Sequence, residues 1–170
     1  MQYNDPFLNL SNNISTKKVT QKEESFLRNL YINSREDEPF LCSMSQTEKI
    51  NFLSNQFYLK EQDYKLRFQD AHFLVLQRKK KNIGRITYKI KDTIHLIDLI
   101  LSKKVRSKGF GTKIMQILIS YAKYNNKVLE LKVSTENLRA LKFYHSLNLQ
   151  ITAQNRDYYT MQIHYKKEVA

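Results

Sequence analysis

The stretch VRSKGFGTK, residues 105–113, holds two of the three glycines in this 170-residue chain. Gly109 and Gly111 stand one residue apart among the basic side chains of Arg106, Lys108 and Lys113. Glycine adopts backbone angles that other residues resist, and it lets a ligand approach the main-chain amides. Glycines set among positive charges therefore predict a turn that binds an anion.

The segments on either side place this turn between a strand and a helix. IHLIDLIL (94–101) is nearly continuous in apolar residues, which predicts a central strand covered on both faces. A helix N-terminus carries unpaired N–H groups and partial positive charge, so it attracts anions, and the ligand we expect here is a pyrophosphate. The apolar face of the helix is formed by Ile114, Ile117, Leu118, Tyr121 and Ala122.

The rest of the chain predicts an α/β protein with a mixed sheet of about seven strands flanked by helices. Capping boxes at Thr20–Glu23 and Ser45–Glu48 begin two helices, the second with a buried stripe of Ile50, Leu53 and Phe57. We expect strands at 13–19, 72–77, 83–90, 94–101, 127–133, 149–153 and 158–165, a charged hairpin turn at 78–82, and a short helix at 137–147.

The resulting order is β-α-α-β-β-β-α-β-α-β-β. A strand–helix–strand unit at 94–133 predicts that its two strands are parallel. The length suits one domain, which we place at 13–170 after a flexible lead-in at 1–12.

Positive charge is concentrated in one segment. The chain has 29 basic and 16 acidic residues, and residues 77–113 hold twelve of the former and only Asp92 and Asp98, giving 12 − 2 = +10. Such a region attracts the phosphates of a nucleic acid or of a phosphorylated small molecule. The alternative is a surface that only increases solubility.

Other features exclude several classes of protein. A lone cysteine, Cys42, allows no intrachain disulfide, which favours a reduced, cytoplasmic setting. The N-terminus has no signal-peptide pattern, and no apolar run is long enough to cross a membrane, so no membrane partner is expected. The histidines His72, His145 and His164 are scattered, and we expect no metal site.

Two familiar phosphate motifs do not fit the glycine stretch. The chain has no G-x-x-x-x-G-K-S/T, and Lys113 and Ile114 stand where G-x-G-x-x-G needs its third glycine. R-x-x-G-x-G does fit, read as Arg106, Gly109 and Gly111. This pattern resembles the coenzyme A pyrophosphate loop of the GNAT superfamily of N-acetyltransferases.

A second segment carries the same resemblance. NLRALKFYHSLNL (137–149) is similar to the superfamily's N-x-x-A-x-x-F-Y-x-x-x-G-F through Asn137, Ala140, Phe143 and Tyr144. The resemblance covers about 13–165 and is tightest in 94–147. Asn148 stands where the family usually has glycine, and since asparagine tolerates left-handed backbone angles, the turn can survive.

The resemblance implies a site for acetyl-coenzyme A. In this family the fourth and fifth strands splay apart and admit the pantetheine arm of the cofactor. Main-chain groups of Leu99, Ile100 and Leu101 would bond the arm, and Asn137 would bond it from the other side or only cap its helix. The pyrophosphate would be held by Arg106 and by the amides of Ser107, Lys108, Gly109, Phe110, Gly111 and Thr112.

The resemblance also implies a mechanism. Tyr144 matches the family's general acid, which protonates the departing thiolate of coenzyme A and contacts the cofactor; the alternative is a core aromatic residue. The base is open between Asp98, His95, Glu130 and a bound water. An unpaired Asp98 would be costly to bury in an apolar strand, so a salt bridge is the alternative for it.

The expected activity is transfer of an acetyl group to a primary amine of a small molecule or protein. Two other readings remain: a GNAT-type toxin that acetylates aminoacyl-tRNA, and a basic nucleic-acid-binding module without catalysis. In this superfamily the acceptor is defined by the segments that correspond to helices 21–68 and strands 150–165. These segments vary widely, so the resemblance implies no particular acceptor. A homodimer and tRNA remain further candidate partners.

Overall fold

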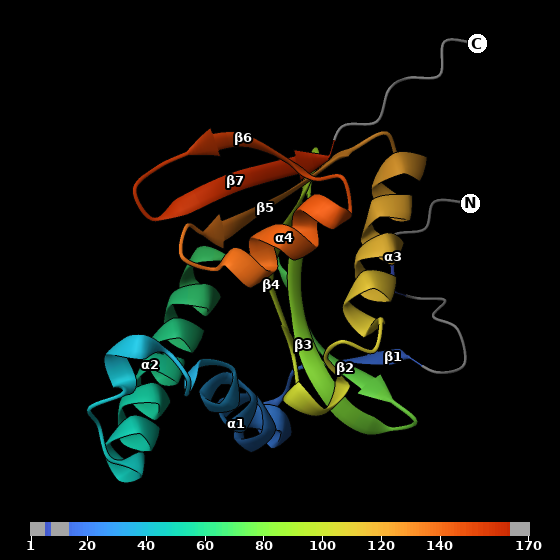
Figure 1. The fold of residues 1–170 in the computed structure, drawn as a ribbon. Helices are drawn as coiled ribbons and strands as arrows, with labels where there is room; N and C mark the ends of the chain where they lie inside the picture. Colours follow the sequence, from blue (N-terminus) through green and yellow to red (C-terminus); the bar gives the residue numbers. More distant parts are fainter. Residues whose placement is uncertain (1–5, 8–13, 164–170) are drawn as a thin grey trace, which may run out of the picture. The chain divides into compact units, whose positions relative to one another are not determined.

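The computed structural model describes residues 6–7 and 14–163. Its seven strands form one mixed sheet in the order β1-β2-β3-β4-β5-β7-β6. The strands are β1 (Ser15–Lys18), β2 (His72–Arg78), β3 (Lys81–Ile90), β4 (Thr93–Leu101), β5 (Val128–Ser134), β6 (Gln150–Gln154) and β7 (Tyr158–Ile163). The α-helices are α1 (Glu24–Arg35), α2 (Gln46–Arg67), α3 (Phe110–Tyr124) and α4 (Leu138–Ser146). This order confirms the predicted fold (Figure 1).

The described chain divides into two compact units. The N-terminal unit comprises 14–87 and 98–108, and the C-terminal unit comprises 6–7, 88–97 and 109–163. Strands β3 and β4 contribute residues to both units. One domain over 13–170 stays a prediction, and the lead-in expected at 1–12 lies outside the described residues except for Pro6 and Phe7.

In the N-terminal unit, α1 and α2 pack together over a buried apolar cluster. Both predicted capping boxes are present, since Thr20 and Ser45 exchange hydrogen bonds with Glu23 and Glu48. The second caps α2 directly, whereas the first caps a 3₁₀ turn ahead of α1, whose own N-cap is Glu23. A short 3₁₀ turn, η1 (Gln21–Glu23), leads into α1, and a second, η2 (Pro39–Leu41), precedes α2. The cluster consists of Leu27, Leu30, Tyr31, Ile32, Leu41, Leu53, Phe57 and Val75. Ile50, predicted as part of the buried stripe, is instead 41% exposed.

The C-terminal unit is built on β5, which pairs antiparallel with β7, while β7 pairs with β6 (Figure 1). The predicted parallel pairing of β4 with β5 is confirmed. Its core includes Ile94, Leu96, Ile114, Met115, Leu118, Ala122, Leu129, Leu131, Leu149 and Met161. Strand β4 is central as predicted, but only Ile94 and Leu96 of it are buried, so the expected cover on both faces is incomplete.

The hairpin between β2 and β3 turns at Lys79 and Lys80, which both have positive φ. The turn lies within the segment predicted from the charge run RKKKN, and Arg78, Lys79, Lys80 and Lys81 are all exposed. Exposure keeps these four charges hydrated, so their proximity costs little.

Glu23 closes the first capping box and provides a test of this local structure. Its carboxylate accepts hydrogen bonds from Lys17 Nζ at 2.7 Å and from Thr20 N and Oγ1 at 2.9 and 2.6 Å. The Lys17 hydrogen bond first, and those from Thr20 next, lower the pKa of Glu23 from 4.5 to about 2.

A lowered pKa means that the unfolded chain binds the proton more tightly, so this contribution to stability is complete above pH 4.5 and is lost as pH falls toward about 2. We expect the free energy of unfolding of Glu23→Gln to fall less steeply than that of the wild type over this interval, as measured by urea titration. Glu24→Gln, at the exposed neighbouring position, is the control and should follow the wild type. Parallel slopes for wild type and Glu23→Gln would contradict the assignment.

Candidate functional site

The glycine stretch forms an uncapped helix start. Gly109 is the N-cap of α3, with φ +77°, and this helix start has no side-chain cap hydrogen bond. A Cβ built on Gly109 would meet no atom within 4 Å, and the first turn carries no acidic residue. The left-handed angle explains glycine here, and the open space leaves room for a ligand beside the backbone.

The second glycine has a different role. Gly111 lies inside α3, and among the described residues Gly109 is the glycine with positive φ. Ser107 adopts the other left-handed angle of the loop, φ +59°, which the sequence did not indicate. Glycine at 111 is therefore not needed for an unusual backbone angle. Its missing side chain would instead leave space for an anion beside the first turn of α3.

Two basic side chains of the loop donate hydrogen bonds to nearby main-chain carbonyl oxygens. Arg106 Nε donates to the carbonyl oxygen of Leu101 at 2.8 Å, and Lys108 Nζ donates to that of Lys104 at 2.8 Å. Lys103, in the 3₁₀ turn η3 (Lys103–Val105), pairs with Asp37 and Glu36 at 2.7 Å each, and these bonds raise its pKa. Arg106 thus holds the turn against the end of β4.

The end of β4 is fixed from within the N-terminal unit. Ile100 packs against the buried cluster of α1 and α2. A Cβ on Gly84 of β3 would overlap the carbonyl oxygen of Ile100 and lie 2.7 Å from Leu101 Cδ2. Glycine at 84 therefore permits a close approach of β3 to the residues predicted to bond the pantetheine arm.

Pairing between β4 and β5 is short. It joins Thr93–Leu96 to Val128–Leu131, although β4 continues to Leu101 and β5 to Ser134. The main-chain groups of Leu99, Ile100 and Leu101 are therefore outside this ladder.

Helix α4 carries the second motif. Asn137 is its N-cap, and Oδ1 accepts from Ala140 N at 3.0 Å, so the capping role is confirmed and the amide nitrogen is the group left to donate to a ligand. Tyr144 is half-buried, with its ring 5.2 Å from that of Phe143. None of the residues of α4 is fully buried, and the role of Tyr144 as the general acid stays a prediction.

The turn after α4 is left-handed, as expected from asparagine in place of the family glycine. Asn148 has φ +65°, the left-handed angle that a family glycine would adopt, and Leu149 behind it is fully buried.

Two of the candidate bases lie together in the C-terminal unit. His95 and Glu130 face each other across β4 and β5, with Nδ1 and Oε1 3.1 Å apart. Gln162 Nε2 donates to the other oxygen of Glu130 at 2.5 Å. His95 is thus oriented by a carboxylate that is itself held in place.

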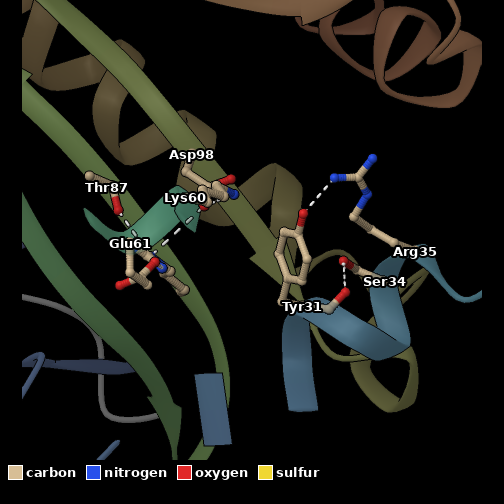
Figure 2. A network of polar contacts seen from close by, with 8 residues as sticks. Tyr31, Ser34, Arg35, Lys60, Glu61, Thr87 and Asp98 are labelled. Carbon is tan, nitrogen blue, oxygen red and sulfur yellow. Dashed lines mark hydrogen bonds and ion pairs between the residues drawn. The ribbon is translucent and has the colours of Figure 1, made fainter. Parts of the chain in front are cut away.

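The third candidate, Asp98, lies in a polar network of the N-terminal unit (Figure 2). Lys60 Nζ donates to Asp98 Oδ2 at 3.1 Å, and Arg85 Nε is 3.8 Å from the same oxygen. Arg85 also bonds Glu61 through Nη1 and Thr87 through Nε. The salt bridge anticipated for Asp98 is confirmed, and its role as a base stays a prediction.

Aromatic rings surround the Lys60 ammonium. Nζ lies 5.2 Å from the ring centre of Tyr31 and 5.0 Å from that of Tyr64. Burial raises the pKa of Tyr31, whose hydroxyl accepts a hydrogen bond from Arg35 (Figure 2). Tyr31 therefore presents a neutral ring at ordinary pH.

No group of three or more metal-ligating side chains occurs among the described residues, and His164 lies outside them. No helix in the described ranges is long and apolar enough to span a bilayer.

Residues 30–148 match the model of the acetyltransferase (GNAT) family. This chain belongs to the GNAT family. The match covers the first motif, the second motif up to Asn148 and every residue predicted for the site, and it begins within α1 and ends just after α4. No curated protein sequence matches the chain significantly.

Solved structures share the GNAT fold. PaiA N-acetyltransferase from Thermoplasma acidophilum, solved with coenzyme A, has a TM-score of 0.66 at 18% identity and covers 92% of this chain and 100% of its own. The protein PH1933 from Pyrococcus horikoshii has 0.64 at 19%, covering 90% and 99%. An acetyltransferase from Thermus thermophilus has 0.65 at 11%, covering 89% and 96%. These identities support the fold alone.

Sequence reasoning missed Gly84, Lys60, Tyr31 and Tyr64 in this GNAT chain. Gly84 is the third glycine, within a run of strand residues, and such a glycine indicates a close backbone approach. The other three lie on helices whose relation to β4 no local pattern reveals.

Gly84→Ala tests the close approach of β3 to β4. We expect it to lower the free energy of unfolding by about 1–3 kcal/mol, as overpacking does, and to shift the amide resonances of Ile100 and Leu101. Lys81→Ala, at an exposed position of the same strand, should leave both unchanged. Unchanged stability and resonances in Gly84→Ala would show that the strands have room for a side chain.

Proposed function

We propose that this GNAT chain transfers an acetyl group from acetyl-coenzyme A to a primary amine by direct attack in a ternary complex. The observation that carries the proposal is the uncapped, glycine-started N-terminus of α3 inside R-x-x-G-x-G. The open approach at Gly109, the N-terminal end of the α3 dipole and the absence of acidic residues from the first turn suit a pyrophosphate. Family membership supports acyl-coenzyme A as its source.

The residues proposed to bind the cofactor fall in three stretches of the sequence. At the end of β4 they are the main chain of Leu99, Ile100 and Leu101. In the glycine loop they are Arg106, Ser107, Lys108, Gly109, Phe110, Gly111 and Thr112, and at α4 they are Asn137 and Tyr144. Because the β4–β5 ladder does not use them, the backbone groups of Leu99–Leu101 suit an extended ligand that bonds like a strand.

Tyr144 is proposed as the general acid. When the amine attacks the thioester, a carbon–nitrogen bond forms, the carbon–sulfur bond breaks, and the thiolate needs a proton. The hydroxyl of Tyr144, a half-buried residue of the second motif, is the proposed donor of this proton. The amine gives up one proton, for which Asp98 is the proposed base and His95, held by Glu130, the alternative.

Release of coenzyme A in the presence of acetyl-coenzyme A and a panel of acceptors tests this function. We would screen small alkylamines and peptides with free amino groups first, and charged tRNA second. Transfer to an amine supports the proposal, and transfer to charged tRNA alone would instead favour the toxin. No transfer to any acceptor, with the cofactor bound, would contradict catalysis.

Tyr144→Phe should keep the affinity for acetyl-coenzyme A and lower kcat by roughly 100-fold or more, the usual contribution of a positioned acid. Calorimetry and steady-state kinetics separate the two effects. Tyr158→Phe, which removes an exposed hydroxyl on β7, is the control. An unchanged kcat in Tyr144→Phe would remove this residue from the mechanism.

Gly111→Asp should weaken cofactor binding on the order of 100-fold or more. Like charges about 4 Å apart repel by about 4 kcal/mol at an effective dielectric constant of about 20, and the added carboxylate would stand at the first turn of α3. Gln116→Asp adds the same charge at an exposed position farther along the helix. Equal affinity in Gly111→Asp and wild type would contradict the loop assignment.

A further inference from the structure

The ammonium of Lys60 occupies a complete recognition site within the N-terminal unit. It lies 3.1 Å from a carboxylate oxygen of Asp98 and within 5.2 Å of two tyrosine ring centres, those of Tyr31 and Tyr64. A carboxylate combined with aromatic faces is the arrangement by which proteins bind organic ammonium ions. The protein's own side chain thus shows what this site accepts.

The charges around the site favour one monovalent cation. Asp98 and Glu61 contribute two negative charges, and Arg85, whose side chain is 3% exposed, contributes one positive charge. With Lys60 the group is neutral, and without it the group carries a net charge of −1. The remaining neighbouring cation, Arg35, also faces Tyr31 but is paired with Glu38.

Lys60 is the more exposed partner of the pair that it forms with Asp98. Its side chain is 22% exposed, compared with 13% for Asp98, and it extends from α2 on a flexible aliphatic stem. A lysine head group that moves to water regains its hydration, so an incoming amine can replace it without leaving a buried, unpaired charge.

The site adjoins the proposed cofactor. Asp98 directly precedes Leu99–Leu101, the residues proposed to bond the pantetheine arm. The pyrophosphate loop follows the C-terminal end of β4, so an arm bonded along β4 runs back from the loop toward Asp98. A strand advances about 3.3 Å per residue, which places an ammonium at Asp98 one residue from the bonded segment.

We propose that Asp98, Tyr31 and Tyr64 form the subsite for the ammonium group of an unbranched primary alkylamine acceptor, and that Lys60 occupies this subsite when no acceptor is bound. The proposal rests on the acetyltransferase function proposed above. The bound ammonium first gives one proton to Asp98, because only the neutral amine has a lone pair that can attack. The amine then forms the new bond to the acetyl carbon and loses a second proton. The thiolate released when the carbon–sulfur bond breaks takes up a proton from Tyr144, and the second proton from the amine restores Tyr144.

The first experiment needs neither cofactor nor turnover. Lys60→Ala removes three methylenes and the ammonium, the equivalent of n-propylammonium. We expect n-propylammonium chloride to raise the thermal midpoint of Lys60→Ala in a saturable manner, and much less so that of the wild type, because Lys60 competes. Sodium chloride at equal ionic strength and the neutral isostere n-propanol should not reproduce the effect.

Two variants make the result specific. Lys60→Ala combined with Asp98→Asn should lose the response to n-propylammonium, and Lys65→Ala, at an exposed lysine of the same helix, should never show it. An equal response to n-propanol would show only an apolar cavity and would overturn the proposal. Absence of any response in folded Lys60→Ala would overturn it as well.

Kinetics then test the link to the acceptor. Lys60→Met keeps the apolar stem and removes the competing charge, so the KM for alkylamines should fall roughly tenfold with little change in kcat, since a tethered group competes at millimolar effective concentration. A higher KM would overturn the proposal. If n-propylammonium raises the thermal midpoint of Lys60→Ala saturably but no alkylamine is acetylated, the result would support the ammonium subsite and contradict the proposed function.

Discussion

The parallel ladder between β4 and β5 ends at Leu96 and Leu131, and the proposed site depends on this early end. Had pairing continued, the main chain of Leu99–Leu101 would be committed to β5. Instead, Gly84 lets β3 approach Ile100 and Leu101 closely, and Ile100 is anchored in the helical cluster. The end of β4 is therefore held firmly on one side and remains outside the β5 ladder on the other.

The loop after β4 extends this constraint. Arg106 bonds the carbonyl oxygen of Leu101, and left-handed angles at Ser107 and Gly109 turn the chain into α3 without a capping side chain. The first turn of α3, which carries no acidic residue, is the end of the helix at which we propose that the ligand phosphate binds. The positive charge of the segment is thus divided between side chains that shape the turn and an exposed hairpin at 78–81.

Charge is arranged differently in the N-terminal unit. Lys60, Glu61, Arg85 and Asp98 balance one another at largely buried positions in a chain with a net charge of +13. Buried ion pairs add little net stability, because desolvation offsets their attraction. Stability alone therefore gives little reason for these charges, and the acceptor subsite proposed above gives them a function.

The sequence predicted the element order, both capping boxes, the parallel pair and the left-handed turn at Asn148, because each follows from a local pattern. It did not predict the exposure of Ile50, because helical spacing alone does not show which residues of α2 meet the cluster: Leu53 and Phe57 are buried there and Phe52 packs against it. Nor did it reveal the relation of Lys60 to Asp98, which are 38 residues apart and meet only through tertiary packing.

Amide resonances measured during titration with acetyl-coenzyme A test the central claim most directly. Leu99–Leu101 and Ser107–Thr112 should shift together with one dissociation constant, because a single cofactor would bind both segments. No shift in either segment, or shifts confined to the basic hairpin at 78–81, would contradict the cofactor site and redirect attention to nucleic acid.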